Sequence, residues 1–164
     1  MNQKNKKPFH KMGTFLALLA IVFFVQYLGA FWVNASVDSW YQDLNKPSWT
    51  PKDEVFGPVW TFLYIVIAAI GYFIWHAKKS EERKKALYVW GAQLVCNALW
   101  SYFFFYKKSI ALGALDLALL LVLIGFLFHY TNRIAKGATI LLLPYTIWVV
   151  YAFFINLGIW IQNS

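Results

Sequence analysis

The sequence predicts an all-α membrane protein, a bundle of five transmembrane helices with a long loop between the first and second helices. Of its 164 residues, 60% are hydrophobic and only 13% are charged, against about 25% charged residues in a typical soluble domain. The charged residues form short clusters between long uncharged stretches, which is typical of loops that flank membrane spans. The net charge of +8 is therefore interpreted as a topology signal, and nucleic-acid binding is not expected. The length predicts a single membrane domain over 1–164.

Five stretches of the chain are long and apolar enough to cross a membrane, which takes about 20 residues per helix. Backbone polar groups must be satisfied within lipid, so the stretches should be helices rather than open strands. The predicted spans are 14–33, 56–77, 86–106, 109–130 and 137–161. The one long connection, 34–55, is the first loop.

The first stretch has two possible interpretations. Four lysines between residues 4 and 11 precede it, and 33–35 would pass as a signal-peptide cleavage site. Its apolar run, 14–33, nevertheless exceeds the usual signal core of about 7–15 residues. The length favours a retained helix.

The basic residues predict the orientation of the spans. Eleven of the fifteen Lys and Arg lie at the N-terminus, in 78–85 and in 131–136 (four, five and two), all on one side of a five-span protein. The positive-inside rule then places the N-terminus in the cytoplasm. The first loop and the C-terminus are expected outside, in a multi-pass protein of the cell membrane.

The nine tryptophans fall into different groups. Four lie near the predicted span ends, where aromatic belts anchor helices at the headgroups: Trp32, Trp75, Trp90 and Trp160. Trp60, Trp100 and Trp148 instead lie within spans, where they either fill the core or bind a ligand.

Polar side chains within the spans predict a pocket. In the third span, Asn97 and Trp100 share one helical face, and Asn156 lies in the fifth. At 1.5 Å per residue, these residues, Trp60 and Asp116 all fall in the outer half of the bilayer. A pocket that opens outward beneath the first loop would collect them. Alternatively, the amides and Asp116 only hydrogen-bond neighbouring helices, which is the favoured interpretation for Asp116.

Conventional catalytic and metal-binding motifs are not evident. The single cysteine, Cys96, excludes an internal disulfide and any multi-cysteine zinc site. No metal site and no cofactor is predicted.

Several motifs resemble those of the tryptophan-rich TspO (translocator / peripheral benzodiazepine receptor) family, from about residue 14 to the C-terminus. They are Trp40-Tyr41, Lys46-Pro47, Trp49, Pro51, Pro58-Val59-Trp60-Thr61, Asn97-Ala98-Leu99-Trp100-Ser101, Ala114-Leu115-Asp116, Pro144-Tyr145, Trp148-Val149, Ala152, Asn156 and Trp160.

The resemblance implies a five-helix bundle that binds porphyrins, haem-like tetrapyrroles and benzodiazepine-type ligands beneath the first loop, which would act as a lid. The ligand-binding residues that it implies are Tyr41, Pro51, Trp60, Asn97, Trp100, Trp148 and Ala152. Asn97 is expected to offer a hydrogen bond to a ligand edge or propionate. Some bacterial members promote light-dependent protoporphyrin breakdown, which would here require Trp60 and Trp148.

The predicted function is a tetrapyrrole-binding protein or sensor. Light-driven chemistry is the second interpretation, in which the excited pigment reacts and an indole donates an electron, because indoles are poor acid–base groups. A transporter of porphyrins or other small hydrophobic molecules is the third. The resemblance also implies a homodimer, whereas cholesterol binding is doubtful because 156–164 contains no Tyr, Lys or Arg.

Overall fold

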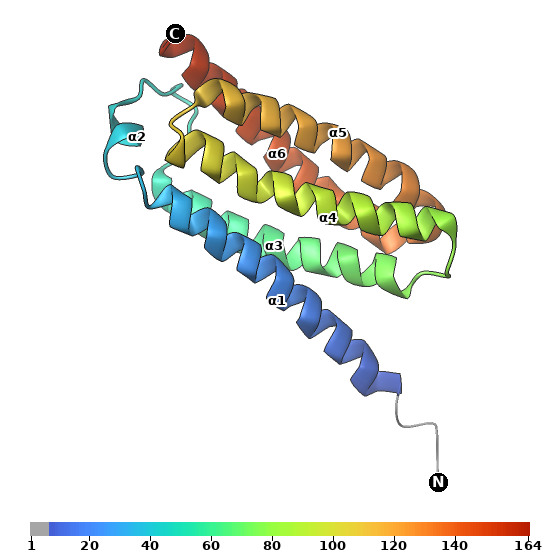
Figure 1. Ribbon diagram of the computed structural model, residues 1–164. Coiled ribbons are helices and arrows are strands. Elements are labelled where there is room, and N and C mark those ends of the chain that lie inside the picture. Colours follow the sequence, from blue (N-terminus) through green and yellow to red (C-terminus); the bar gives the residue numbers. More distant parts are fainter. Residues whose placement is uncertain (1–6) are drawn as a thin grey trace.

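The computed structural model describes residues 7–164, with side chains from Lys11 onward, and this range is helical without strands (Figure 1). The helices are α1 (Lys7–Val33), α2 (Trp40–Asp43), α3 (Asp53–His76), α4 (Glu81–Ser101), the π-helix η2 (Tyr102–Tyr106), α5 (Ile110–Ile134) and α6 (Lys136–Gln162). The basic leader residues Lys4 and Lys6 lie outside the described residues. The all-α prediction is confirmed.

Four of the helices are long and apolar enough to cross a membrane: α1 from Lys11, α3, α5 and α6. Helix α4 is not among them, because it begins with five charged residues and carries the amides Gln93 and Asn97 in its interior. The predicted third span, 86–106, corresponds to the uncharged part of α4 together with η2.

The long helices form a closed ring. Helix α1 packs against α3 and α4, α4 packs against α5, α5 against α6, and α6 against α3. The segment between α1 and α3, residues 34–52, contains α2 and lies at the same end of the bundle as the C-terminus (Figure 1). We call residues 34–52 the covering segment.

Charged residues at helix ends explain why some helices are longer than their uncharged runs. Helix α3 begins at Asp53 rather than at residue 56, with Asp53 and Glu54 in its first turn, where carboxylates favour the positive end of the helix dipole. Helix α5 continues to Ile134 with Arg133 in its last turn, which favours the negative end.

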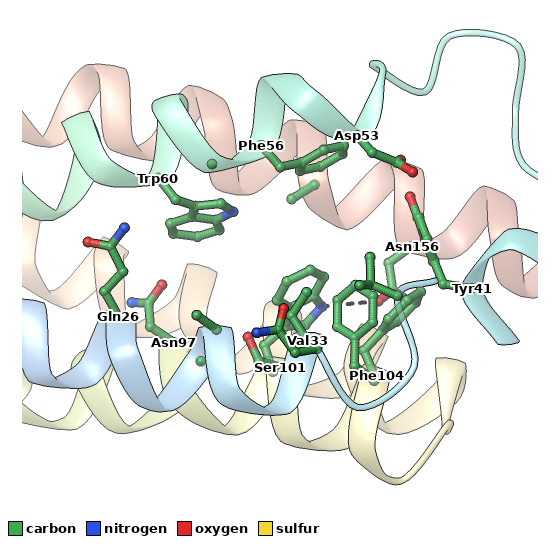
Figure 2. A pocket seen from close by; sticks show the side chains of 18 of the residues that line it. Gln26, Val33, Tyr41, Asp53, Phe56, Trp60, Asn97, Ser101, Phe104 and Asn156 are labelled. Atoms are coloured by element: carbon green, nitrogen blue, oxygen red, sulfur yellow. Dashed lines mark hydrogen bonds between the residues drawn. The ribbon is translucent and has the colours of Figure 1, made fainter. Parts of the chain in front are cut away.

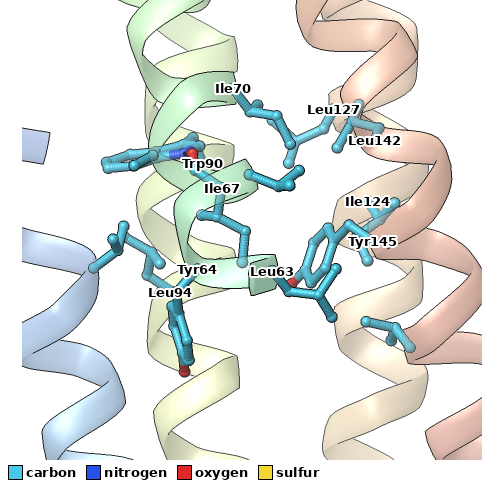
Figure 3. Close-up of a cluster of buried hydrophobic side chains, with 14 of the residues drawn as sticks. Leu63, Tyr64, Ile67, Ile70, Trp90, Leu94, Ile124, Leu127, Leu142 and Tyr145 are labelled. Carbon is cyan, nitrogen blue, oxygen red and sulfur yellow. Dashed lines mark hydrogen bonds between the residues drawn. The ribbon is translucent and has the colours of Figure 1, made fainter. Parts of the chain in front are cut away.

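The core fills the ring between α3, α5 and α6. Ile67, Ile70, Leu120, Leu127 and Leu142 are at most 1% exposed and belong to one hydrophobic cluster. Figure 3 shows Ile67, Ile70, Leu127 and Leu142 among the side chains of this cluster.

Trp90 belongs to this core, and its prediction as a membrane-belt residue is wrong. Its side chain is 7% exposed, and its Nε1 donates a hydrogen bond of 2.9 Å to the carbonyl oxygen of Ile67. The indole lies against Gly71 of α3, which has no side chain to displace it. Trp90 therefore fastens α4 to α3.

This contact predicts that a side chain at position 71 lowers the stability of the protein. A Cβ at position 71 would lie 2.7 Å from the Trp90 ring, so Gly71→Ala forces the two helices apart. We expect a loss of about 1–3 kcal/mol, measured by thermal unfolding in detergent. Gly91→Ala is the matched control, because a Cβ there meets nothing within 4 Å and alanine favours helix by about 1 kcal/mol. Equal melting temperatures for the two variants would contradict the prediction.

Candidate ligand-binding site

A cavity of about 260 Å³ lies within the ring, beneath the covering segment (Figure 2). Helices α1, α3, α4 and α6, the π-helix and the covering segment all contribute to its lining. The lining is mainly apolar, and its aromatic side chains come from the covering segment, α3, α4 and η2. The cavity is at the end of the bundle where the sequence analysis expected a pocket.

Aromatic rings form one wall of the cavity. The rings of Trp60 and Trp100 stack with centroids 6.5 Å apart and planes 29° from parallel. Trp100 stacks in turn on Phe104, at 5.6 Å and 24°. Three roughly parallel rings from α3, α4 and η2 thus present aromatic surface to the cavity, and such surface favours a flat aromatic partner.

Asn156 of α6 orients the central ring of this wall. Its Oδ1 accepts a hydrogen bond of 3.2 Å from Trp100 Nε1, and its Nδ2 donates one of 2.8 Å to the carbonyl oxygen of Ile110. A Cβ at Gly113 would lie 2.8 Å from Asn156 Oδ1, so the glycine leaves space for the amide. Asn156 therefore links α4, α5 and α6 through one buried side chain.

A buried polar cluster lies at another part of the lining. Asn97 Nδ2 is 2.7 Å from the hydroxyl of Tyr145 and 2.8 Å from Oε1 of Gln93. The Tyr145 hydroxyl donates a hydrogen bond of 2.6 Å to the same Gln93 oxygen. Of the three side chains, only Asn97 reaches the cavity. Its N–H groups are directed at protein acceptors, which is at odds with the expectation that Asn97 donates to a ligand propionate.

The π-helix η2 shapes the end of the cavity nearest the covering segment. Phe104 and Phe105 line the cavity from η2, and both are buried. The hydroxyl of Ser36 donates a buried hydrogen bond of 2.7 Å to the carbonyl oxygen of Phe105. The first part of the covering segment is thereby fixed to the π-helix.

Tyr41 closes the cavity at the same end. The centroid of its ring is 5.4 Å from that of Phe105. The Nζ atom of Lys46 lies over the Tyr41 ring, 4.2 Å from the ring centroid. Burial, with a smaller contribution from the charge of Asp53, raises the pKa of Tyr41 to about 12. The phenol therefore keeps its proton at physiological pH.

The second part of the covering segment is attached to the end of α6. Asn45 and Asn163 exchange two hydrogen bonds, of 3.0 and 2.8 Å, and the Tyr151 hydroxyl donates one of 2.6 Å to the carbonyl oxygen of Trp49. Pro47 packs so closely on Gly158 that no side chain would fit there. These contacts hold the segment over the cavity.

Five of the predicted ligand-binding residues line the cavity together, and two do not. Those in the lining are Tyr41, Trp60, Asn97, Trp100 and Ala152. Pro51 and Trp148 are outside it. Trp148 lies one helical turn before Ala152, and its ring packs against Phe56 and Tyr151 at centroid distances of 5.8 Å. Trp148 is therefore next to a lining residue, Phe56, rather than in the lining.

Sequence reasoning missed the contribution of α1. Gln26, Gly29 and Val33 line the cavity from this helix. Gln26 is the only amide in the predicted first span, and that isolated polar group was the available signal. Phe56 of α3 was also missed, because a phenylalanine near a span end is unremarkable.

Comparison with known proteins shows the family of the chain. A model of the TspO/MBR family matches residues 16–161, nearly the whole chain. The chain belongs to the TspO/MBR family. Among proteins of this family, a tryptophan-rich protein TspO of Archaeoglobus fulgidus is 35% identical, with 93% of this chain and 96% of the relative covered.

Further TspO/MBR relatives are bacterial and mammalian. A tryptophan-rich protein TspO of Bacillus cereus is 30% identical over 87% of this chain and 95% of its own. The translocator protein of Bos taurus is 28% identical over 84% of this chain and 83% of its own. The chain is thus a membrane protein similar to both TspO and translocator proteins.

Proposed function

We propose that the chain is a multi-pass protein of the cell membrane that binds porphyrin-like tetrapyrroles, and benzodiazepine-type ligands, in the cavity beneath the covering segment. The observation that carries the proposal is the stack of Trp60, Trp100 and Phe104. A flat macrocycle can bury one face against such a wall, and each aromatic contact adds about 0.5–1.5 kcal/mol beyond area burial.

The lining also leaves room for a ligand wider than the cavity itself. Ala30 of α1 and Gly57 of α3 line the cavity and are both exposed. A Cβ at Gly57 would meet nothing within 4 Å. A macrocycle edge can extend between these small residues toward the lipid.

We also propose that all five long helices span the membrane as one domain. Residues 86–106 carry no charge, and α4 continues directly into η2. Helix α4 packs along both α1 and α5, which are themselves long enough to span. The polar groups of α4, Gln93 and Asn97, are buried inside the bundle and so avoid lipid.

The proposed topology is tested by cysteine labelling on intact cells. With Cys96 replaced by serine, a cysteine at the exposed Ser39 should react with an impermeant thiol reagent, because eleven of fifteen basic residues hold the opposite side in the cytoplasm. A cysteine at Asn132, exposed in the last turn of α5, should react only after lysis. Labelling of position 132 on intact cells would invert the orientation.

Two other roles compete with simple binding. Light-driven breakdown of a bound pigment is favoured by the position of Trp60 in the lining, where an indole can donate an electron to the excited ligand. Transport is less well supported, because the centre of the bundle is filled by side chains such as Leu63 and Ile67, 2% and 1% exposed. The homodimer stays a prediction.

Binding is tested by quenching of tryptophan fluorescence on titration with protoporphyrin in the dark. Trp100→Leu removes the central ring of the wall and should weaken binding up to about tenfold. Trp160→Leu is the control, because Trp160 lies outside the cavity and is 44% exposed. Saturable quenching that is equal in both variants, or no saturable quenching at all, would refute binding at this cavity.

A further inference from the structure

Two amide side chains in the cavity lining have orientations that the surrounding hydrogen bonds determine. The first is Asn97 of α4, 4% exposed. Its Nδ2 lies 2.9 Å from the carbonyl oxygen of Gln93, which can only accept a hydrogen bond. The nitrogen must therefore be at that position, and the amide cannot be flipped. Oδ1 of Asn97 is left buried with no partner among the described residues.

The second is Gln26 of α1. Its Nε2 is 2.9 Å from the hydroxyl oxygen of Thr61, and that hydroxyl donates its single proton to the carbonyl oxygen of Gly57 at 2.9 Å. Thr61 can then only accept from Gln26, so the nitrogen of Gln26 must face it. Oε1 of Gln26 is likewise buried and has no partner within residues 7–164.

Both free oxygens belong to side chains that line the cavity. Figure 2 shows Gln26 and Asn97 at the end of the cavity away from Tyr41, with Trp60 over the same end. The N–H groups of Asn97 are directed at protein acceptors, whereas Gln26 uses one N–H for Thr61 and retains a second. A buried acceptor without a partner is costly, and a ligand donor recovers that cost.

We propose that Oε1 of Gln26 and Oδ1 of Asn97 form a pair of hydrogen-bond acceptors, which selects planar aromatic ligands that carry an N–H or O–H donor. A carboxylate or carbonyl group at this end would leave both of these amide oxygens without a partner. This proposal rests on the proposed function, since it assigns polarity and orientation to the ligand of the same cavity.

A matched pair of probes tests the subsite directly. Carbazole carries one N–H, and N-methylcarbazole is the same flat tricycle without a donor. We expect the full-length protein in detergent to bind carbazole about tenfold more tightly, measured by equilibrium dialysis against empty micelles. Displacement by protoporphyrin shows that the probes occupy the proposed cavity.

Substitutions separate hydrogen bonding from the bulk of the added methyl group. Gln26→Leu and Asn97→Leu should bring the ratio of the two affinities toward one, whereas Asn132→Leu, at an exposed residue outside the cavity, should retain the wild-type ratio. Gln26→Leu loses a single protein hydrogen bond, so it remains informative if Asn97→Leu does not fold. A ratio near one in the wild type, or an unchanged ratio in Gln26→Leu, overturns the proposal.

Thr61→Val provides an independent check on orientation. It removes the acceptor that fixes the Gln26 amide, so the amide can turn its N–H groups to the cavity. Fluorenone, a flat tricycle with only a carbonyl acceptor, should then bind several-fold more tightly than to the wild type; no gain would contradict the assigned orientation of Gln26. The affinity ratio is measured in the absence of protoporphyrin, which is added only in the displacement control, so loss of the affinity ratio and loss of porphyrin binding are separate results.

Discussion

Replacing Trp60 with phenylalanine should leave most of the dark binding of protoporphyrin intact and remove most of the light-driven loss of the bound pigment. Trp60 lines the cavity and stacks on Trp100. A phenyl ring preserves an apolar face at this position, so affinity is largely retained. The oxidisable indole is lost, so the excited pigment loses the electron donor in its proposed binding site.

The comparison with two other tryptophans makes this result interpretable. Trp148→Phe should slow pigment decay less than Trp60→Phe, because Trp148 contacts Phe56 rather than the cavity. Trp160→Phe, at a side chain 44% exposed, should change neither property. The measurement is dark affinity and illuminated pigment absorbance for all three variants. If the pigment decays at the same rate in every variant, Trp60 only shapes the cavity, and the light-driven interpretation is wrong.

Loosening the covering segment should accelerate ligand release. Asn163→Ala removes both hydrogen bonds with the backbone of Asn45, and Gly158→Val places a side chain where Pro47 packs. At about 1 kcal/mol per hydrogen bond, we expect the dissociation rate of protoporphyrin to rise on the order of tenfold. Deletion of 45–49 should have a larger effect. The association rate should change less, as is usual for variants of one binding site.

Stopped-flow displacement of bound protoporphyrin measures these rates. Gly125→Val is the matched control, because a Cβ at Gly125 of α5 meets nothing within 4 Å and the residue is outside the cavity. Dissociation that is unchanged in Asn163→Ala, Gly158→Val and the deletion would remove the covering segment from the release mechanism.

Much of the site could be predicted because helical spacing is a local property of the sequence. Asn97 and Trp100 are three residues apart, and this spacing placed them on the one face of α4 that meets the cavity. Trp60 could be distinguished from the membrane-belt tryptophans because it lies within a predicted span rather than at its end. The uncharged runs likewise located the long helices to within a few residues.

The remaining features depend on contacts between distant segments. Trp90 is near a predicted span end, yet the absence of a side chain at Gly71 lets it enter the core. Gln26 has no periodic polar neighbour in its helix, and only its hydrogen bond to Thr61 reveals its orientation. Trp148 was predicted to bind the ligand, but it packs against Phe56 and lies outside the lining.

The π-helix at Tyr102–Tyr106 has a consequence for which sequence changes the protein can accept. A π-turn contains one residue more than the corresponding α-turn, and each residue of an α-helix advances about 100°. Deleting any one residue of 102–106 would restore regular helix and rotate everything before it relative to α5. The Trp100 indole would turn away from Asn156, and Phe105 would lose its alignment with Ser36. The α4–α5 hairpin should therefore accept changes of side chain in this segment far more readily than changes of length.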